Sequence, residues 1–194
     1  MLKVTIQDNT LAQLADSLSQ AKREPLMRGA SITLCVDVQK YMRQQAQAHH
    51  LSAHRLNATP TGHLEHAADS VRAAYTANAA MVNIYSPGFG RVFAPITIRP
   101  KRAAALTIPI AKESYGTRAA ELRARGWKLF CASPQKGVLF GTNPVSKKTK
   151  PLYALKKSTT LPRDRTLLPT HEKMSLSVSR GIQNTLDAIH RGRI

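Results

Sequence analysis

Aromatic residues are scarce in this sequence, because Phe, Trp and Tyr together make up only 5% of its 194 residues. A core must therefore be built from Leu, Ile, Val and Ala. Stacking of aromatic rings on unpaired bases, which single-strand binding proteins use, is poorly supported. Two cysteines, Cys35 and Cys131, are too few for a disulfide scaffold. They predict a protein of a reducing compartment whose thiols are buried in the core.

Long apolar runs are also missing. The longest stretch, around residues 103–111, is about half of the roughly 20 residues that a membrane-spanning helix needs. The first residues reach Asp8 too early for the apolar region of a signal peptide. We therefore expect no contact with a membrane. Hydrophobic residues still make up 42% of the chain, which is enough to build a packed core.

Acidic residues are few, with 11 Asp and Glu against 29 Lys and Arg, for a net charge of +18. Residues 1–90 hold 8 basic and 6 acidic residues, whereas residues 91–194 hold 21 and 5, so the second half carries +16. This excess of positive charge attracts phosphate backbones without distinguishing base sequences. A solvated surface that keeps the protein soluble is the alternative. The candidate DNA-facing residues, all in predicted turns, are Arg99, Lys101, Arg102, Lys147, Lys148 and Lys150.

The periodicity of apolar residues predicts an α+β fold with a mainly antiparallel sheet. A short helix is expected over residues 10–18, and Pro25 is expected near the break before a long helix over 31–51. Short strands follow between residues 71 and 156, and Thr170 is expected to cap a C-terminal helix. The chain is predicted to form one domain, 1–194. It divides into N-terminal helices (1–56), a sheet-rich core (57–158), and an extended arm with the C-terminal helix (159–194).

Catalytic motifs are not found in the sequence. It has no Gly-rich phosphate loop and no Gly-x-Ser-x-Gly nucleophile elbow, so we expect no enzyme activity and no cofactor. Four histidines form a weak alternative metal site, because their spacing of three and four residues can bring imidazoles together in pairs. Exposed polar helix ends are the favoured interpretation, because no cysteine lies nearby and residues 57–62 form a flexible separator. The four histidines are His50, His54, His63 and His66.

The middle of the chain, residues 58–170, resembles the virion-morphogenesis proteins of long-tailed bacteriophages and prophages. This family includes Mu-like morphogenesis proteins and lambdoid tail-completion proteins. The motifs that carry the resemblance are Pro60-Thr61-Gly62, Leu64, Ala67-Ala68, Ser86-Pro87-Gly88-Phe89, Thr97-Ile98-Arg99-Pro100-Lys101-Arg102, Ala105-Leu106-Thr107-Ile108-Pro109, Tyr115-Gly116, Tyr153-Ala154-Leu155-Lys156-Lys157-Ser158, Leu161-Pro162-Arg163-Asp164 and Leu167-Leu168-Pro169.

The resemblance implies structural work in the virion. Family members are similar to neck or tail-completion proteins, which form a homo-oligomeric ring at the head–tail junction around the DNA channel. The implied partners are further copies of the chain, the head connector or adaptor, the tail terminator or tail tube proteins, and the DNA backbone. The implied location is the virion, assembled in the host cytoplasm. The implied fold is a small α+β domain whose long N-terminal helix packs on an antiparallel sheet.

The extended segment 159–170 predicts an arm that reaches a neighbouring subunit, because two prolines stiffen it. Its expected contact residues are Leu161, Pro162, Leu167, Leu168 and Pro169. The alternative for this segment is a surface loop that closes on its own domain. The alternative for the whole protein is a sequence-independent nucleic-acid-binding protein that uses the C-terminal basic loops.

Overall fold

The computed structural model describes residues 2–5, 20–48, 51–132 and 137–191. The chain divides into two compact units. Unit 1 comprises residues 1–47, 62–94 and 163–194, and unit 2 comprises residues 48–61 and 95–162. The sequence pattern predicted one domain with boundaries near 57 and 159, and the structure differs because each unit is assembled from segments far apart in the chain. The predicted helix over 10–18 lies outside the described residues.

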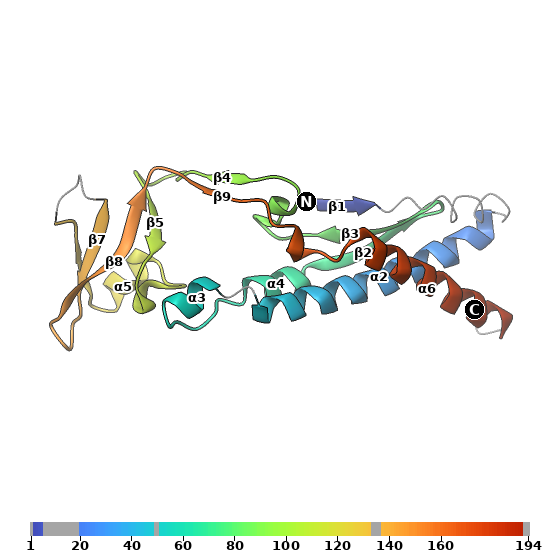
Figure 1. Ribbon diagram of the computed structural model, residues 1–194, viewed down its shortest axis with the longest axis horizontal. Helices are drawn as coiled ribbons and strands as arrows, with labels where there is room; N and C mark the ends of the chain where they lie inside the picture. The colour runs from blue at the N-terminus through green and yellow to red at the C-terminus, as the bar shows by residue number, and fades with distance from the viewer. Residues whose placement is uncertain (1, 6–19, 49–50, 133–136, 192–194) are drawn as a thin grey trace. The chain divides into compact units, whose positions relative to one another are not determined.

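Unit 1 is built on the long helix α2, Gln20–Ala48, which packs on a three-stranded antiparallel sheet (Figure 1). The sheet has the order β1-β3-β2, formed by Leu2–Thr5, Ala79–Ile84 and Val71–Thr76. Apolar side chains of α2 recur at helical spacing, with Ala30, Leu34 and Val38 all buried. Pro25 lies inside α2 and not at a break, so the helix continues past the position at which proline removes one backbone hydrogen bond.

Two further α-helices are described in unit 1. The short helix α4, His63–Asp69, buries Leu64, Ala67 and Ala68. The C-terminal helix α6, His171–His190, begins at Thr170, whose Oγ1 accepts a hydrogen bond from the Lys173 N–H at 3.4 Å, as the sequence predicted. Val178 and Ile182 of α6 enter the same core as α2, and Met174 and Leu186 pack against that core. The prediction of an α+β fold with a long helix, antiparallel sheets and a C-terminal helix is therefore confirmed.

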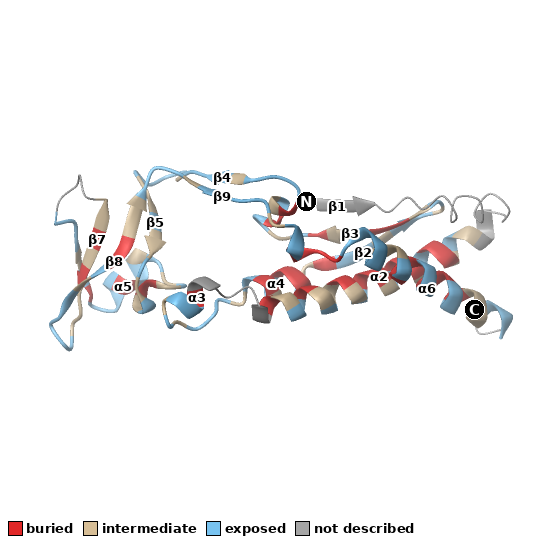
Figure 2. Ribbon diagram, viewed as in Figure 1, coloured by how far each residue is buried: buried red, intermediate tan, exposed pale blue. Residues whose placement is uncertain are grey.

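Unit 2 contains a four-stranded antiparallel sheet and a two-stranded ribbon. The sheet has the order β5-β8-β7-β6, formed by Leu106–Pro109, Thr149–Lys156, Val138–Thr142 and Lys128–Phe130. The ribbon pairs β4, Ile96–Ile98, with β9, Thr159–Leu161, and all its residues are exposed or half-buried (Figure 2). Two short helices belong to this unit, α3 (Leu51–Arg55) and α5 (Ala119–Ala124).

The core of unit 2 is small. Its buried residues are Leu122, Trp127, Leu139, Leu152 and Tyr153. Three hydrogen bonds tie loops to the edge of this core. The Ser114 hydroxyl donates to the Leu152 carbonyl at 2.6 Å, the Ile110 N–H donates to the same carbonyl at 2.9 Å, and the Tyr153 hydroxyl donates to the Thr117 carbonyl at 2.8 Å. Polar groups buried at the edge of this core are thus satisfied.

Candidate functional site

The charge of the protein is divided unequally between the two units. Unit 2 carries 15 Lys and Arg against two acids, a net of +13, whereas unit 1 carries 14 against nine, a net of +5. The strong field therefore belongs to the smaller unit and not to the C-terminal half as a whole. A field of this size attracts polyanions and accelerates their association.

Both acids of unit 2 are already paired. Glu113 accepts a hydrogen bond and ion pair from Lys150, and Glu121 lies 4.0 Å from Arg118. Among the described residues of unit 2, no other ion pair neutralises a basic side chain. The remaining described lysines and arginines of this unit are therefore available to bind phosphate groups.

The six predicted DNA-facing residues do not share one environment. Arg99, Lys101 and Arg102 lie in an exposed loop between β4 and β5, and Lys147 and Lys148 lie in the exposed turn between β7 and β8. Lys150 differs, because its Nζ contacts Glu113 and lies 5.8 Å from the centroid of the Trp127 ring. The Lys150 ammonium group therefore stabilises unit 2 through Glu113 and Trp127, in addition to contributing positive charge.

The Lys150 contact holds the pKa of Glu113 below its ordinary value, because the hydrogen bond stabilises the carboxylate more than burial disfavours it. The folded pKa is lower than the unfolded value near 4.5, so this contribution to stability is complete above that pH. It is lost as the pH falls through the lowered folded pKa. We expect Glu113→Gln to flatten this acid-dependent loss of stability in urea titrations of Trp127 fluorescence between about pH 6 and pH 3. Identical pH dependence of wild type and variant would contradict the assignment.

The turn between β7 and β8, residues 143–148, is held in one conformation. The Asn143 Oδ1 accepts hydrogen bonds from the Val145 and Ser146 N–H groups at 2.8 and 3.0 Å. The Asn143 N–H donates to the Lys148 carbonyl at 3.0 Å, and Lys147 adopts a positive φ of 58°. Below the turn, the hydroxyls of Thr142 and Thr149 lie 2.8 Å apart. The backbone of the turn is therefore held in place by these hydrogen bonds.

Three of the five residues predicted to form the inter-subunit arm are buried in unit 1. Leu167 is 1% exposed and Leu168 is 6% exposed, and both belong to the core of unit 1, with Pro169 also buried. The expectation that these three residues reach a neighbouring subunit is therefore corrected, because their apolar side chains are already used within their own unit. Leu161 is half-buried in β9, where it pairs with Ile96, and Pro162 is exposed.

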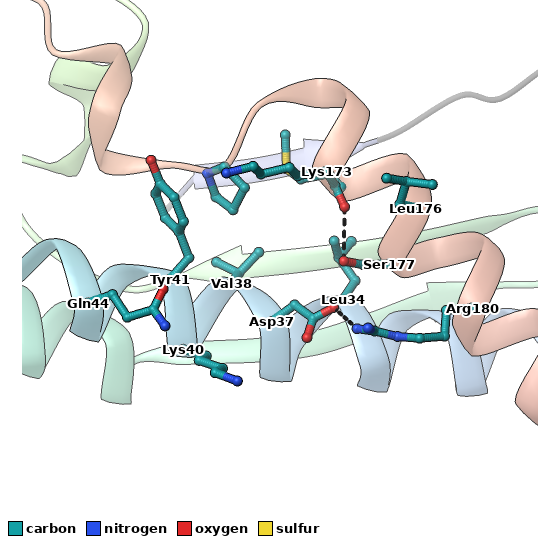
Figure 3. Close-up of a pocket in the computed structure, with 12 residues that line it drawn as sticks. Leu34, Asp37, Val38, Lys40, Tyr41, Gln44, Lys173, Leu176, Ser177 and Arg180 are labelled. Atoms are coloured by element: carbon teal, nitrogen blue, oxygen red, sulfur yellow. Dashed lines mark hydrogen bonds and ion pairs between the residues drawn. The ribbon is translucent and has the colours of Figure 1, made fainter.

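Unit 1 contains an open groove of about 520 Å³ between α2 and α6 (Figure 3). Its apolar part includes Leu34, Val38 and Leu176, and the Leu176 side chain is 70% exposed. Arg180 forms an ion pair with Asp37 across the groove, and Lys173 Nζ lies 5.8 Å from the centroid of the Tyr41 ring. The remaining lining residues are Lys40, Gln44, Pro169, Met174 and Ser177.

Periodicity alone missed the face on which α2 and α6 meet. Ser177, Gly181 and Thr185 are all buried on α6 at a spacing of four residues. A Cβ atom on Gly181 would lie 2.7 Å from the Ala30 Cα, so only glycine allows the two backbones to approach this closely. The repeat of small residues every fourth position was the available signal.

The described histidines of the alternative metal site belong to different units. His54 belongs to unit 2 and His63 and His66 belong to unit 1, while His50 lies outside the described residues. Among the residues that the structure describes, no group of three His, Cys, Asp or Glu side chains is placed to hold a metal ion. Of the described helices, none is both long and apolar enough to span a membrane.

The two cysteines differ. Cys35 is buried, its Sγ donates to the Val71 carbonyl at 3.8 Å, and burial raises the pKa of its thiol. Cys131 is exposed at the end of β6, so the prediction that it is a core residue is wrong. The strand is only three residues long and ends before this side chain can be covered.

No family model, curated protein or solved structure matches this chain. The units and their surfaces therefore provide the basis on which a function can be proposed.

Proposed function

We propose that the protein is a structural virion component at the head–tail junction of a bacteriophage or prophage. In this role it forms part of a neck or tail-completion ring that joins the head connector to the tail around the DNA channel. It would be made in the host cytoplasm and act without catalysis. The family resemblance of residues 58–170 supports this proposal, together with the division of charge between the two units.

The observation that carries the proposal is the net charge of +13 on unit 2, whose two acids are both paired. A ring through which DNA passes needs positive loops that contact phosphates without reading bases. The loops that hold Arg99, Lys101 and Lys147 have this character.

A ring also needs two different surfaces on each subunit, because its contacts are heterologous. Unit 1 offers one candidate surface in the groove between α2 and α6, which is lined by the exposed side chain of Leu176 and by the cations Lys40 and Lys173. Unit 2 offers another in the exposed β4–β9 ribbon. These surfaces support an assembly role better than an isolated monomer.

The basic surface of unit 2 also favours a second candidate, a free nucleic-acid-binding protein that ignores sequence. The two functions differ in where the protein is found. A virion component is present in purified particles at a fixed number of copies, whereas a free binding protein is absent from them. Quantitative mass spectrometry of particles purified on a density gradient distinguishes the two.

Deletion of the gene from the phage that encodes it tests the proposed role directly. We expect DNA-filled heads and complete tails that fail to join, and we expect the gene supplied from a plasmid to restore joining. Electron micrographs and plaque counts measure both results. Infectious particles at the wild-type yield from the deletion strain would refute the proposal. Class averages of the purified protein test for the ring itself.

A further inference from the structure

The β7–β8 hairpin carries the most exposed large apolar side chain among the described residues. Val145 is 88% exposed at the tip of the hairpin, next to Pro144. One exposed apolar residue is ordinary on a protein surface. Here it lies on a turn fixed by Asn143, and two exposed lysines, Lys147 and Lys148, follow it. A rigid apolar tip with adjacent cations is suited to a partner that offers both apolar and anionic groups.

Duplex DNA is such a partner. Its minor groove is about 6 Å wide and is lined on both sides by phosphates. Proteins that bind there often insert an apolar side chain as a wedge between base steps and bend the duplex. A hairpin tip is narrow, and Pro144 contributes no N–H group that would be left unpaired between bases. The lysines that follow the tip can contact the phosphates beside it.

A membrane surface fits less well. Interfacial anchors bury large side chains such as Trp, Phe or Leu over a wide apolar face. The tip offers one exposed valine beside the half-buried Pro144, flanked by Asn143 and Ser146. This apolar area is small for lipid but sufficient for a single base step.

We propose that the β7–β8 hairpin tip enters the minor groove of duplex DNA, with Val145 as a wedge at a base step and Lys147 and Lys148 on the flanking phosphates. The inference rests on the DNA contact in the proposed function and specifies how unit 2 makes that contact. The tip makes no base-specific hydrogen bond, but it favours pyrimidine–purine steps, because these kink most easily.

The test measures binding and bending with the full chain. Ligase-catalysed ring closure of a DNA fragment shorter than the persistence length of about 150 bp reports bending wherever the protein binds. We expect the wild type to promote ring closure and Val145→Ser to bind without promoting it. Val145→Ile should retain ring closure, because it keeps an apolar wedge of similar shape. Ring closure by Val145→Ser at the wild-type level would overturn the proposal.

The lysines are tested by the salt dependence of duplex binding. The double substitution Lys147→Gln with Lys148→Gln should make the negative slope of log K, the DNA association constant, against log salt shallower by about 2. Each phosphate contact contributes about 0.9 to the magnitude of this slope. The matched control is Lys156→Gln with Lys157→Gln, which removes the same charge at the other end of β8. An equal fall in both variants would overturn the assignment to the tip.

Two further outcomes separate this inference from the proposed function. Absence of duplex binding at low salt, or Val145-dependent binding to anionic phosphatidylserine vesicles without any effect on DNA, overturns the hairpin assignment. Neither outcome changes the test of head–tail joining, which is made separately in the deletion strain. If the deletion strain fails to join heads to tails but Val145→Ser bends DNA as well as the wild type does, the proposed function stands and only the wedge is rejected.

Discussion

Replacing Gly181 by valine is expected to lower the free energy of unfolding of unit 1 by about 3 kcal/mol, at the upper end of the usual cost of overpacking. A Cβ atom at this position would lie 2.7 Å from the Ala30 Cα and 2.9 Å from the Gly29 carbonyl oxygen. These are backbone atoms of α2, so they cannot rotate away as a flexible side chain would. The two helices must move apart, and the core that they share must loosen.

Gly181→Ala separates packing from helix propensity. In an exposed helix this change would stabilise the fold by about 1 kcal/mol, so a net loss of stability shows that the close approach outweighs propensity. Urea unfolding followed by helical circular dichroism measures both variants. Ser179→Ala is the control, because Ser179 is exposed on the same helix and such changes usually stay within about 0.5 kcal/mol.

Gly29 provides a comparison in which the clash can be removed. A Cβ atom there would lie 1.9 Å from the Thr185 Oγ1, which belongs to a side chain and not to the backbone. We expect Thr185→Ala to rescue much of the stability lost in Gly29→Ala. A Cβ atom on Gly181 would also lie 2.9 Å from the Thr33 Oγ1. No matching rescue is expected there, and full rescue of Gly181→Val by Thr33→Ala would contradict the role assigned to the backbone.

The sequence predicted the elements of this fold better than their assembly. The predicted strand region starts at residue 71, where β2 begins, and the predicted C-terminal helix follows Thr170, with Val178 and Ile182 in the core of unit 1. Ile189, near the end of the same helix, is exposed. Such features follow from local periodicity, which side-chain burial imposes on each element separately. The two units could not be predicted in this way. Unit 1 joins three separate segments, and no local pattern records which segments meet.

The candidate sites show the same limit. The proline-rich segment 159–170 predicted an arm, yet Leu167 and Leu168 are buried in unit 1. Proline prevents regular secondary structure but does not prevent burial of the leucines beside it. Lys147, Lys148 and Lys150 form one cluster in the sequence, but alternation along β8 and the nearby Glu113 give Lys150 a different environment. Composition predicted the charge, and tertiary structure determined which cations remain unpaired.

Leu152→Ala is expected to remove most of the stability of unit 2. Leu152 is 0% exposed in a core of five buried residues, and truncation of a buried leucine costs about 2–5 kcal/mol. Unit 2 contains 82 residues, and a core in a unit of this size rarely supplies more than about 3–5 kcal/mol. The loss is therefore comparable to the whole stability of the unit.

The single tryptophan of the chain makes this loss visible. Trp127 is 9% exposed in the core of unit 2, whereas the long helices α2 and α6 belong to unit 1. In Leu152→Ala we expect Trp127 emission to shift to the red at much lower urea than in the wild type, while most of the helical circular dichroism persists. Leu34→Ala, which truncates an equally buried leucine of α2, should give the reverse pattern. Coincident shifts of both signals in both variants would show that the two units unfold as one cooperative structure.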